Sequence, residues 1–202
     1  MTDPRPTDAH LHIFARWPEP GKAKTRLIPA FGADGAAAIY TRLLAHTVAV
    51  AKASGLDFTV RATGASPERF RQMFGEEVTF IDQGEGDLSA KLSRVPAPGI
   101  VIGSDCPGLT PALLLAARDT LVKTDGGKDA VVIGPARDGG YYLLGFAEDA
   151  GFAFADMAWS TDTVFAETVR RFVARGIRPA ILPELSDIDT ADDLADWPEF
   201  RM

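Results

Sequence analysis

Apolar residues recur along the chain in two alternating patterns, which predict strands and helices in regular succession. Short apolar runs at 11–15, 99–103 and 130–134 predict buried strands, because a strand covered on both faces is apolar throughout. Helical spacing of apolar residues predicts a long helix over 35–54, which Gly55 ends. The other expected strands cover 56–62, 78–81, 140–146 and 179–182, and the other expected helices cover 67–74, a stretch through 94 after the loop 82–88, 111–122, 162–175 and 191–197. This alternation predicts an α/β fold with a largely parallel sheet.

Length and composition set bounds on the organisation of the chain. With 202 residues, of which 46% are hydrophobic, the chain can build one sizeable core, so we expect a single domain over residues 1–202. The formal net charge of -7 argues against a nucleic-acid or acidic-membrane partner, because such proteins usually show a basic face. These features do not predict an oligomeric state.

The cysteine content and the lengths of the apolar runs bear on the compartment. Cys106 is the sole cysteine, so no internal disulfide can form, as is typical of reducing compartments. The sequence has neither a leader-like N-terminal pattern nor an apolar stretch of the ~18 residues that a membrane span needs. We therefore expect a soluble, cytoplasmic protein.

A basic loop follows the first expected strand. The stretch 14–27 holds four cations against one acid, and three of these cations are Lys22, Lys24 and Arg26. Two prolines and a glycine break regular structure there, so the cations are partly pre-ordered for an incoming anion. The stretch lacks the glycine patterns of a P-loop and of a dinucleotide-binding fingerprint. We expect Lys and Arg side chains to bind a small anion such as phosphate; the alternative is a solvated basic surface loop.

Four aspartates fall in expected loops: Asp105, Asp138, Asp187 and Asp189. Asp105 follows a buried strand, and ligands of open α/β sheets bind at the carboxyl ends of central strands. Loop carboxylates are candidate ligands for Mg²⁺, which is usually held by one or two carboxylates together with substrate phosphates. The alternative for Asp189 is helix capping, since it lies just ahead of an acidic helix start.

The segment 138–142 places a carboxylate beside two glycines and two tyrosines. Gly139 and Gly140 would let a sugar or base come close, while Tyr141 and its neighbour would offer stacking surface and hydroxyls. Asp138 is the candidate catalytic base toward an acceptor hydroxyl. A plain β-turn would have the same sequence pattern.

The segment 159–161 joins an aromatic ring to two hydroxyls at an expected helix start. Trp159, Ser160 and Thr161 are candidate substrate contacts. Ser160 or Thr161 could instead be the N-cap of that helix.

Two histidines near the start of the chain suggest a different chemistry. The pattern Asp8-x-His10-x-His12 is how amidohydrolases begin a metal site. That interpretation needs further histidines and a (β/α)₈ barrel of ~250 residues, whereas only His46 remains. We expect instead two histidines on the edge of a strand.

Five segments, in this order, resemble the DUF2064-type family of bacterial glycosyltransferases, which includes a group associated with arsenosugar biosynthesis. The matching segments are 20–27, 103–109, 134–145, 159–161 and 187–190, within a resemblance that extends over 13–194. The resemblance implies a GT-A-type, Rossmann-like three-layer α/β/α sandwich of the nucleotide-diphospho-sugar transferase superfamily. It also implies that Asp105 and Asp189 bind Mg²⁺ or Mn²⁺ together with a nucleotide. The match is looser at 89–91, where the family pattern has Gly and Arg, so a role for Lys91 is not implied.

The function implied by this resemblance is transfer from a nucleotide sugar to a small-molecule acceptor. The basic loop also resembles 2-phospholactate guanylyltransferases, a neighbouring family of the same fold, which would use a nucleoside triphosphate and release pyrophosphate. Sugar-activating nucleotidyltransferases usually carry a Gly-x-Gly-x-Arg turn after the first strand, and its absence here favours glycosyl transfer. A non-catalytic nucleotide-binding module is the third possibility.

Overall fold

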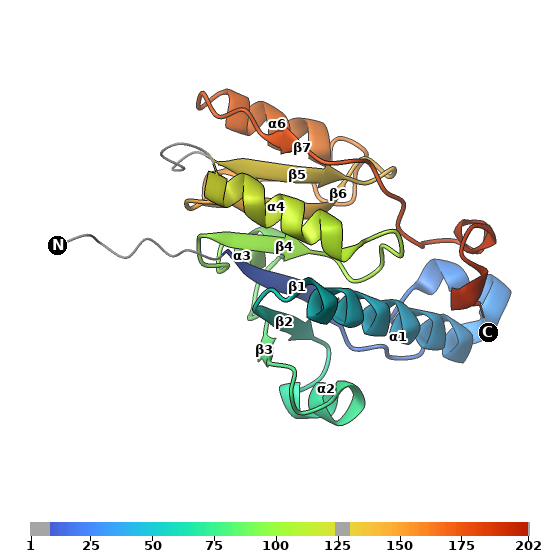
Figure 1. Ribbon diagram of the computed structural model, residues 1–202. Coiled ribbons are helices and arrows are strands. Elements are labelled where there is room, and N and C mark those ends of the chain that lie inside the picture. The colour runs from blue at the N-terminus through green and yellow to red at the C-terminus, as the bar shows by residue number, and fades with distance from the viewer. Residues whose placement is uncertain (1–8, 124–129, 202) are drawn as a thin grey trace.

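The computed structural model describes residues 9–123 and 130–201, and its strands form a single twisted sheet. The strands are β1 His10–Arg16, β2 Phe58–Thr63, β3 Phe80–Asp82, β4 Gly99–Ile102, β5 Val131–Pro135, β6 Tyr141–Phe146 and β7 Ala180–Ile181. They pair in the order β3-β2-β1-β4-β6-β5-β7 (Figure 1). Only β6 runs antiparallel to its neighbours, β4 and β5. The prediction of a largely parallel α/β sheet is therefore confirmed.

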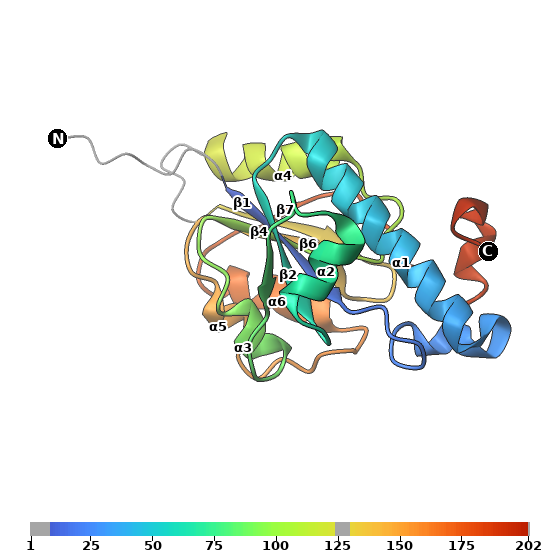
Figure 2. The same ribbon diagram turned by 90° about the horizontal axis from the view of Figure 1, so that it is seen from below.

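Helices cover both faces of this sheet. They are α1 Ile28–Ser54, α2 Pro67–Phe74, α3 Leu88–Leu92, α4 Pro111–Lys123, α5 Gly151–Phe154 and α6 Val164–Val173, with short 3₁₀ turns η1 Thr25–Leu27, η2 Asp193–Ala195 and η3 Pro198–Phe200. Figure 2 shows α1 and α4 on one side of the sheet and α3, α5 and α6 on the other. This is the expected three-layer α/β/α sandwich.

Side-chain alternation along β1 supplies both faces of the core. Leu11 and Ile13 are fully buried in the cluster under α1 and α4, whereas Phe14 packs against the cluster formed with α5 and α6. All four residues of β4 are buried, as the continuous apolar run predicts for a strand covered on both faces. The two clusters therefore fix β1 and β4 as inner strands and hold their carboxyl ends side by side.

Several element boundaries differ from those expected. The first helix begins at Ile28 instead of at 35, because Gly32 (φ 69°, ψ 171°) allows a kink and the helical pattern resumes after it. The expected helix over 191–197 is only the 3₁₀ turn η2 at Asp193–Ala195, and a second turn, η3, follows it at Pro198–Phe200. The four-residue helix α5 was not predicted, since so short an element carries no periodic pattern.

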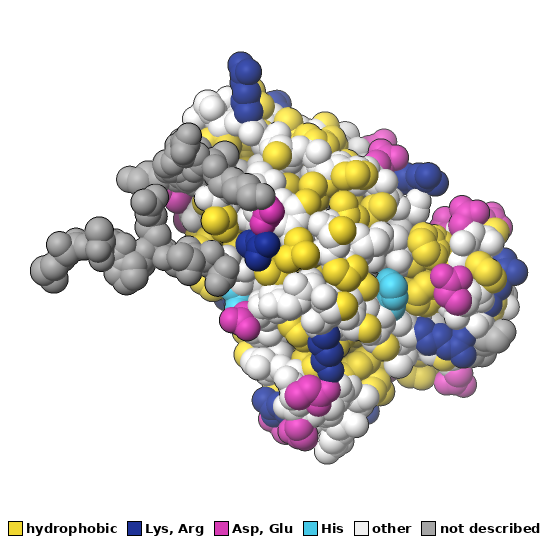
Figure 3. Space-filling model, viewed as in Figure 1, with side chains coloured by type: hydrophobic (Ala, Val, Ile, Leu, Met, Phe, Trp, Pro, Cys, Tyr) yellow, Lys and Arg dark blue, Asp and Glu magenta, His cyan; other side chains and the backbone are white. Residues whose placement is uncertain are grey.

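No helix within 9–123 and 130–201 has the combined length and apolar character of a membrane span. On the face drawn in Figure 3, Lys and Arg side chains of the described residues lie scattered among acidic and apolar ones. The cations therefore form no continuous basic surface on this face, and the net charge of the whole sequence is -7.

The two histidines of the first strand lie in the interior of the sheet, so their placement on a strand edge was wrong. Strand β1 is paired on both sides, with β2 and with β4. His12 is only 3% exposed and its Nδ1 accepts a hydrogen bond of 3.2 Å from Nε of Arg61. His10 contacts the Thr59 hydroxyl at 2.8 Å, and Asp8 lies outside the described residues. The pair is thus packed against polar partners of β2.

Burial, the charge of Arg61 and the neighbouring His10 lower the pKa of His12 to about 3. The unfolded chain, with an ordinary histidine pKa near 6.5, binds more protons than the folded chain between these two values. Neutral His12 therefore contributes stability that is complete above about pH 6.5 and is lost as the pH falls toward 3.

We expect His12→Gln to reduce the acid sensitivity of the fold. Between pH 7 and pH 5 the free energy of unfolding should fall by about 2 kcal/mol less in the variant than in the wild type, as measured by urea denaturation. His46→Gln, on α1, is the matched control. Parallel pH profiles for wild type and His12→Gln would contradict the assignment.

Candidate active site

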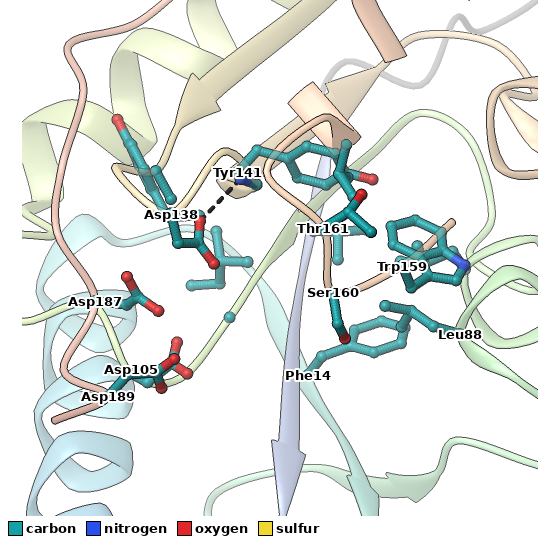
Figure 4. A pocket seen from close by; sticks show the side chains of 18 residues that line it. Phe14, Leu88, Asp105, Asp138, Tyr141, Trp159, Ser160, Thr161, Asp187 and Asp189 are labelled. Atoms are coloured by element: carbon teal, nitrogen blue, oxygen red, sulfur yellow. Dashed lines mark hydrogen bonds between the residues drawn. The ribbon is translucent and has the colours of Figure 1, made fainter. Parts of the chain in front are cut away.

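A cavity of about 400 Å³ lies at the carboxyl ends of β1 and β4. Chain connections leave this point in opposite directions, toward β2 on one side and toward β6 on the other, and such a crevice is where open α/β sheets bind ligands. Its walls include Asp105 after β4, Asp138 between β5 and β6, and Asp187 and Asp189 after β7. Figure 4 shows these four carboxylates on one side of the cavity.

Three of the aspartates converge. Asp105, Asp187 and Asp189 each offer one carboxylate oxygen, and these oxygens lie within 4.8 Å of one another. The backbone N–H of Ile188 donates to the carbonyl of Asp105 at 3.0 Å, and the Ile188 side chain is fully buried. Because successive side chains of an extended segment point to opposite sides, burying Ile188 leaves both flanking carboxylates at the cavity.

Asp187 belongs to this cluster, although the expected metal ligands were Asp105 and Asp189 alone. Burial, followed by the charges of Asp105, Asp189 and Asp138, raises the pKa of Asp187 to about 6. The sequence does indicate that Asp187 and Asp189 could act together, because a single apolar residue, Ile188, separates them. What the sequence could not give is the proximity of that pair to Asp105.

Lys24 is the cation that the structure places among these acids. Its Nζ donates to Oδ2 of Asp105 at 2.9 Å and to Oδ1 of Asp189 at 2.6 Å, and its side chain is only 8% exposed. Burial alone would lower the pKa of Lys24, but the charges and hydrogen bonds of the two aspartates outweigh burial and raise it. The ammonium therefore stays charged and ties the basic loop to the acid cluster.

Two of the other three cations of the basic loop, Lys22 and Arg26, remain at the surface. Lys22 is 67% exposed and pairs with Glu19 at 3.0 Å. Arg26 is 74% exposed, and its guanidinium reaches Oδ2 of Asp189 at 3.1 Å. Lys24 thus points into the acid cluster, whereas Lys22 and Arg26 lie at the rim of the cavity. Contacts of Lys22 and Arg26 with phosphate stay a prediction.

The carboxylate cluster fits a hard divalent cation. It supplies only oxygen donors, which Mg²⁺ and Mn²⁺ prefer, and two of its members already hold a positive group, the Lys24 ammonium. Helix capping, the alternative for Asp189, is not observed: the N-cap of the following turn η2 is Asp192, and no side chain caps that turn. The Asp193 carboxylate accepts from the N–H groups of Asp189 at 3.0 Å and of Thr190 at 2.6 Å, so the carboxylate of Asp189 is left for the cluster.

The turn that carries Asp138 is docked on the start of α6. Oδ1 of Asp138 accepts from the N–H of Gly140 at 2.8 Å, and the carbonyl of Gly139 accepts from the N–H of Phe165 at 2.8 Å. Gly139 has a φ of 87°, and a Cβ there would lie 2.2 Å from the carbonyl oxygen of Asp162. Glycine is therefore required by both backbone conformation and space.

The tyrosines beside Asp138 do not offer their hydroxyls to the cavity, contrary to expectation. Tyr142 donates to the carbonyl of Pro183 at 3.0 Å. The hydroxyl of Tyr141 is buried beside Thr168 of α6, and burial raises the pKa of Tyr141. The ring of Tyr141 meets Trp159 edge to face, with centroids 6.5 Å apart. These residues present ring surface instead of polar groups.

The segment 159–161 lines the same cavity. Thr161 donates to the carbonyl of Ala158 at 2.8 Å, while Ser160 adopts a left-handed conformation with φ 63°. Neither residue is the N-cap of α6, because Thr163 holds that position. The capping alternative for Ser160 and Thr161 was wrong, and their role as substrate contacts stays a prediction.

A second cavity of about 350 Å³ lies beside the first, toward β2. The two cavities share wall residues, which include Phe14, Leu88 and Asp105. Gln83, which sequence analysis did not single out, lines the second cavity, and its amide donates to the carbonyls of Ala15 at 3.0 Å and Arg61 at 2.9 Å. The lining also includes Lys91, Arg16 and Thr63.

The fold is that of the nucleotide-diphospho-sugar transferase class. A solved structure of a "putative nucleotide-diphospho-sugar transferase" from Desulfovibrio desulfuricans G20 superposes with a TM-score of 0.82 at 28% identity, over 90% of this chain and 82% of that one. The chain belongs to a bacterial family, described as uncharacterized proteins conserved in bacteria (DUF2064), which matches residues 45–161. The resemblance and the GT-A-type fold expected from the sequence are thereby confirmed.

A more distant structure is CMP:2-keto-3-deoxy-manno-octonic acid synthetase complexed with CTP. It has 17% identity and a TM-score of 0.49, over 93% of this chain and 95% of that one. No curated protein matches the chain.

We expect Lys24→Met to raise the affinity for Mn²⁺ measured without nucleotide by about tenfold or more. Methionine keeps the apolar length of the side chain but removes the ammonium that competes for Asp105 and Asp189; tenfold corresponds to about 1.4 kcal/mol. Titration followed by electron paramagnetic resonance of free Mn²⁺ measures this. Lys22→Met, on the same loop but 67% exposed, should change nothing. An unchanged or weakened affinity in a folded Lys24→Met protein would contradict this competition.

Proposed function

We propose that the protein is a metal-dependent glycosyltransferase that moves a sugar from a nucleotide-sugar donor to a small-molecule acceptor. The observation that carries the proposal is the charge of the larger cavity. The described residues that line it include four aspartates and no Lys or Arg; Lys24 and Arg26 contact Asp105 and Asp189 without lining the cavity. Such a wall suits a neutral acceptor hydroxyl that must lose a proton.

The same observation favours glycosyl over nucleotidyl transfer. A sugar-activating nucleotidyltransferase attaches its nucleotide to a phosphate group, so its acceptor enters as an anion. Carboxylates lining the acceptor side would repel that anion, whereas cations would attract it. Two further cations, Lys91 and Arg16, line the smaller cavity, and Lys24 and Arg26 lie on the side of Asp105 and Asp189.

The two adjoining cavities support an extended donor. The smaller cavity, with Gln83 held by two backbone carbonyls, would take the nucleoside. The diphosphate would then reach Asp105, which both cavities share. A Mg²⁺ or Mn²⁺ ion held by Asp105, Asp187 and Asp189 would supply the positive charge that stabilises the departing diphosphate.

The basic loop would complete this arrangement from the protein side. Lys24 and Arg26 already contact Asp189, so their charges lie where a diphosphate bound to the cluster would arrive. Arg26 can make a bidentate contact with a phosphate, which Lys cannot. Lys22, on the same loop, adds positive charge at the rim.

Asp138 would act on the acceptor. Its carboxylate is exposed at the cavity, and its turn is fixed by contacts of Gly139 and Gly140. A positioned carboxylate can take the proton of an attacking hydroxyl when it lies within about 3 Å of that group or one water away. Asp138 is therefore assigned as the general base, apart from the three converging acids.

The reaction type is tested by its products. With UDP-, GDP- and dTDP-sugars and a mixture of hydroxylated acceptors, we expect release of a nucleoside diphosphate that stops in EDTA. The rate should fall by about 10²-fold or more in Asp105→Ala. Nucleoside triphosphates with 2-phospholactate form the comparison reaction. Pyrophosphate release there, with no nucleoside diphosphate from any sugar nucleotide, would overturn the proposal in favour of nucleotidyl transfer.

We expect Asp138→Asn to lower kcat by about 10²-fold or more while leaving metal-dependent nucleotide binding nearly unchanged. The asparagine Oδ1 can still accept from the N–H of Gly140, so the turn is kept and only the base is removed. Steady-state kinetics and calorimetry with the nucleotide measure the two effects. Loss of nucleotide binding would instead place Asp138 in the metal site.

A further inference from the structure

The end of the larger cavity that faces away from the acids is apolar. Its walls include Phe14 of β1, Leu88 of α3, Val101 of β4 and Val164 of α6, together with the ring of Trp159. Figure 4 shows Phe14, Leu88 and Trp159 on the opposite side of the cavity from Asp105, Asp187 and Asp189. Leu88 is 39% exposed, one of few large apolar side chains of the described residues that remain open to solvent.

The polar atoms of Trp159 and Tyr141 are either hydrogen-bonded elsewhere or fully buried. Nε1 of Trp159 donates to the Ser89 hydroxyl at 2.8 Å, and Ser89 in turn donates to the carbonyl of Phe154 at 2.7 Å. The hydroxyl of Tyr141 is buried beside Thr168. This end of the cavity therefore offers mainly ring faces and aliphatic carbon, with the hydroxyl of Ser160 beside Phe14 as a polar group among them (Figure 4).

That chemistry selects against a sugar and against an anion. A sugar ring held at this end would lose more hydrogen bonds to water than the single Ser160 hydroxyl can replace, and unpaired polar groups are costly to bury. An anionic acceptor would face the carboxylate of Asp138, and no Lys or Arg is among the described residues that line this cavity. A neutral ring with few hydroxyls would lose few hydrogen bonds to water and would not be repelled by a carboxylate. Its transfer from water to these apolar walls is favourable.

The size of the cavity agrees with such a ring. A benzene-sized ring fills a cavity of roughly 150 Å³, which is a fraction of the volume of about 400 Å³ found here. The remainder extends toward Asp138 and the converging acids, where the transferred sugar would lie. A hydroxyl one bond from the ring would then point from the apolar end toward Asp138.

From these observations we infer that the acceptor is a neutral alcohol or phenol carrying an apolar six-membered ring, which binds between Leu88, Phe14 and Trp159. This inference rests on the proposed glycosyl transfer and specifies the acceptor of that reaction. Leu88 determines specificity, because it is the exposed member of the apolar wall. Trp159 provides a flat surface whose N–H is already satisfied.

The test is direct binding, which needs no turnover. Saturation-transfer NMR on the purified protein with benzyl alcohol and cyclohexylmethanol should give ring-proton signals at least fivefold stronger than those of glycerol, glucose or benzoate. Leu88→Ser should weaken the benzyl alcohol signal at least threefold. Val173→Ser is the matched control, since Val173 of α6 is a 53% exposed apolar residue outside the cavity, and its signal should equal that of the wild type.

Two results would overturn the inference. Equal or stronger signals from benzoate or glucose would show an anionic or sugar acceptor, and an unchanged signal in Leu88→Ser would place the ring elsewhere. Failure of the proposed reaction is recognised separately. If nucleoside diphosphate forms with glucose as the acceptor while no ring alcohol binds, only this inference fails; if ring alcohols bind but no sugar nucleotide is consumed, the proposed reaction fails.

Discussion

Three carboxylates at the end of β4 are held together against their mutual repulsion, and much of the cleft depends on that balance. At separations within 4.8 Å the repulsion of each pair is on the order of 3 kcal/mol at the effective dielectric constant near a protein surface. Two structural features oppose it. The hydrogen bond from the backbone N–H of Ile188 to the carbonyl of Asp105 holds the segment 187–189 in place. The Lys24 ammonium neutralises part of the negative charge.

This balance links parts of the chain that are distant in sequence. Lys24 and Asp105 are separated by 81 positions, and Lys24 and Asp189 by 165. The basic loop after β1 and the segment after β7 therefore meet over the end of β4 without sharing a strand pair. A cation that bound these carboxylates would compete with Lys24 for Asp105 and Asp189.

The sequence predicted the sheet and most of the cleft for physical reasons that act locally. Continuous apolar runs identified β4 and β5, and loop position after a buried strand identified Asp105. It could not show that Asp187 joins the cluster, because that follows from the burial of Ile188 against a remote loop. The direction of the tyrosine hydroxyls was equally inaccessible from the sequence. The hydroxyl of Tyr142 is bonded to the carbonyl of Pro183 after β7, and the hydroxyl of Tyr141 is buried beside Thr168 of α6.

The contact between Gly139 and Asp162 has a mechanical consequence. Backbone atoms of the two segments touch so closely that no side chain fits between them, and the Gly139 carbonyl is bonded to Phe165 at the start of α6. The turn bearing Asp138 and the helix start that follows Trp159 are thus joined as one rigid wall. A bound molecule that displaced Trp159 would therefore also displace the turn that carries Asp138. The shape of a ligand at the apolar end of the cleft would then affect the position of the Asp138 carboxylate at the other end.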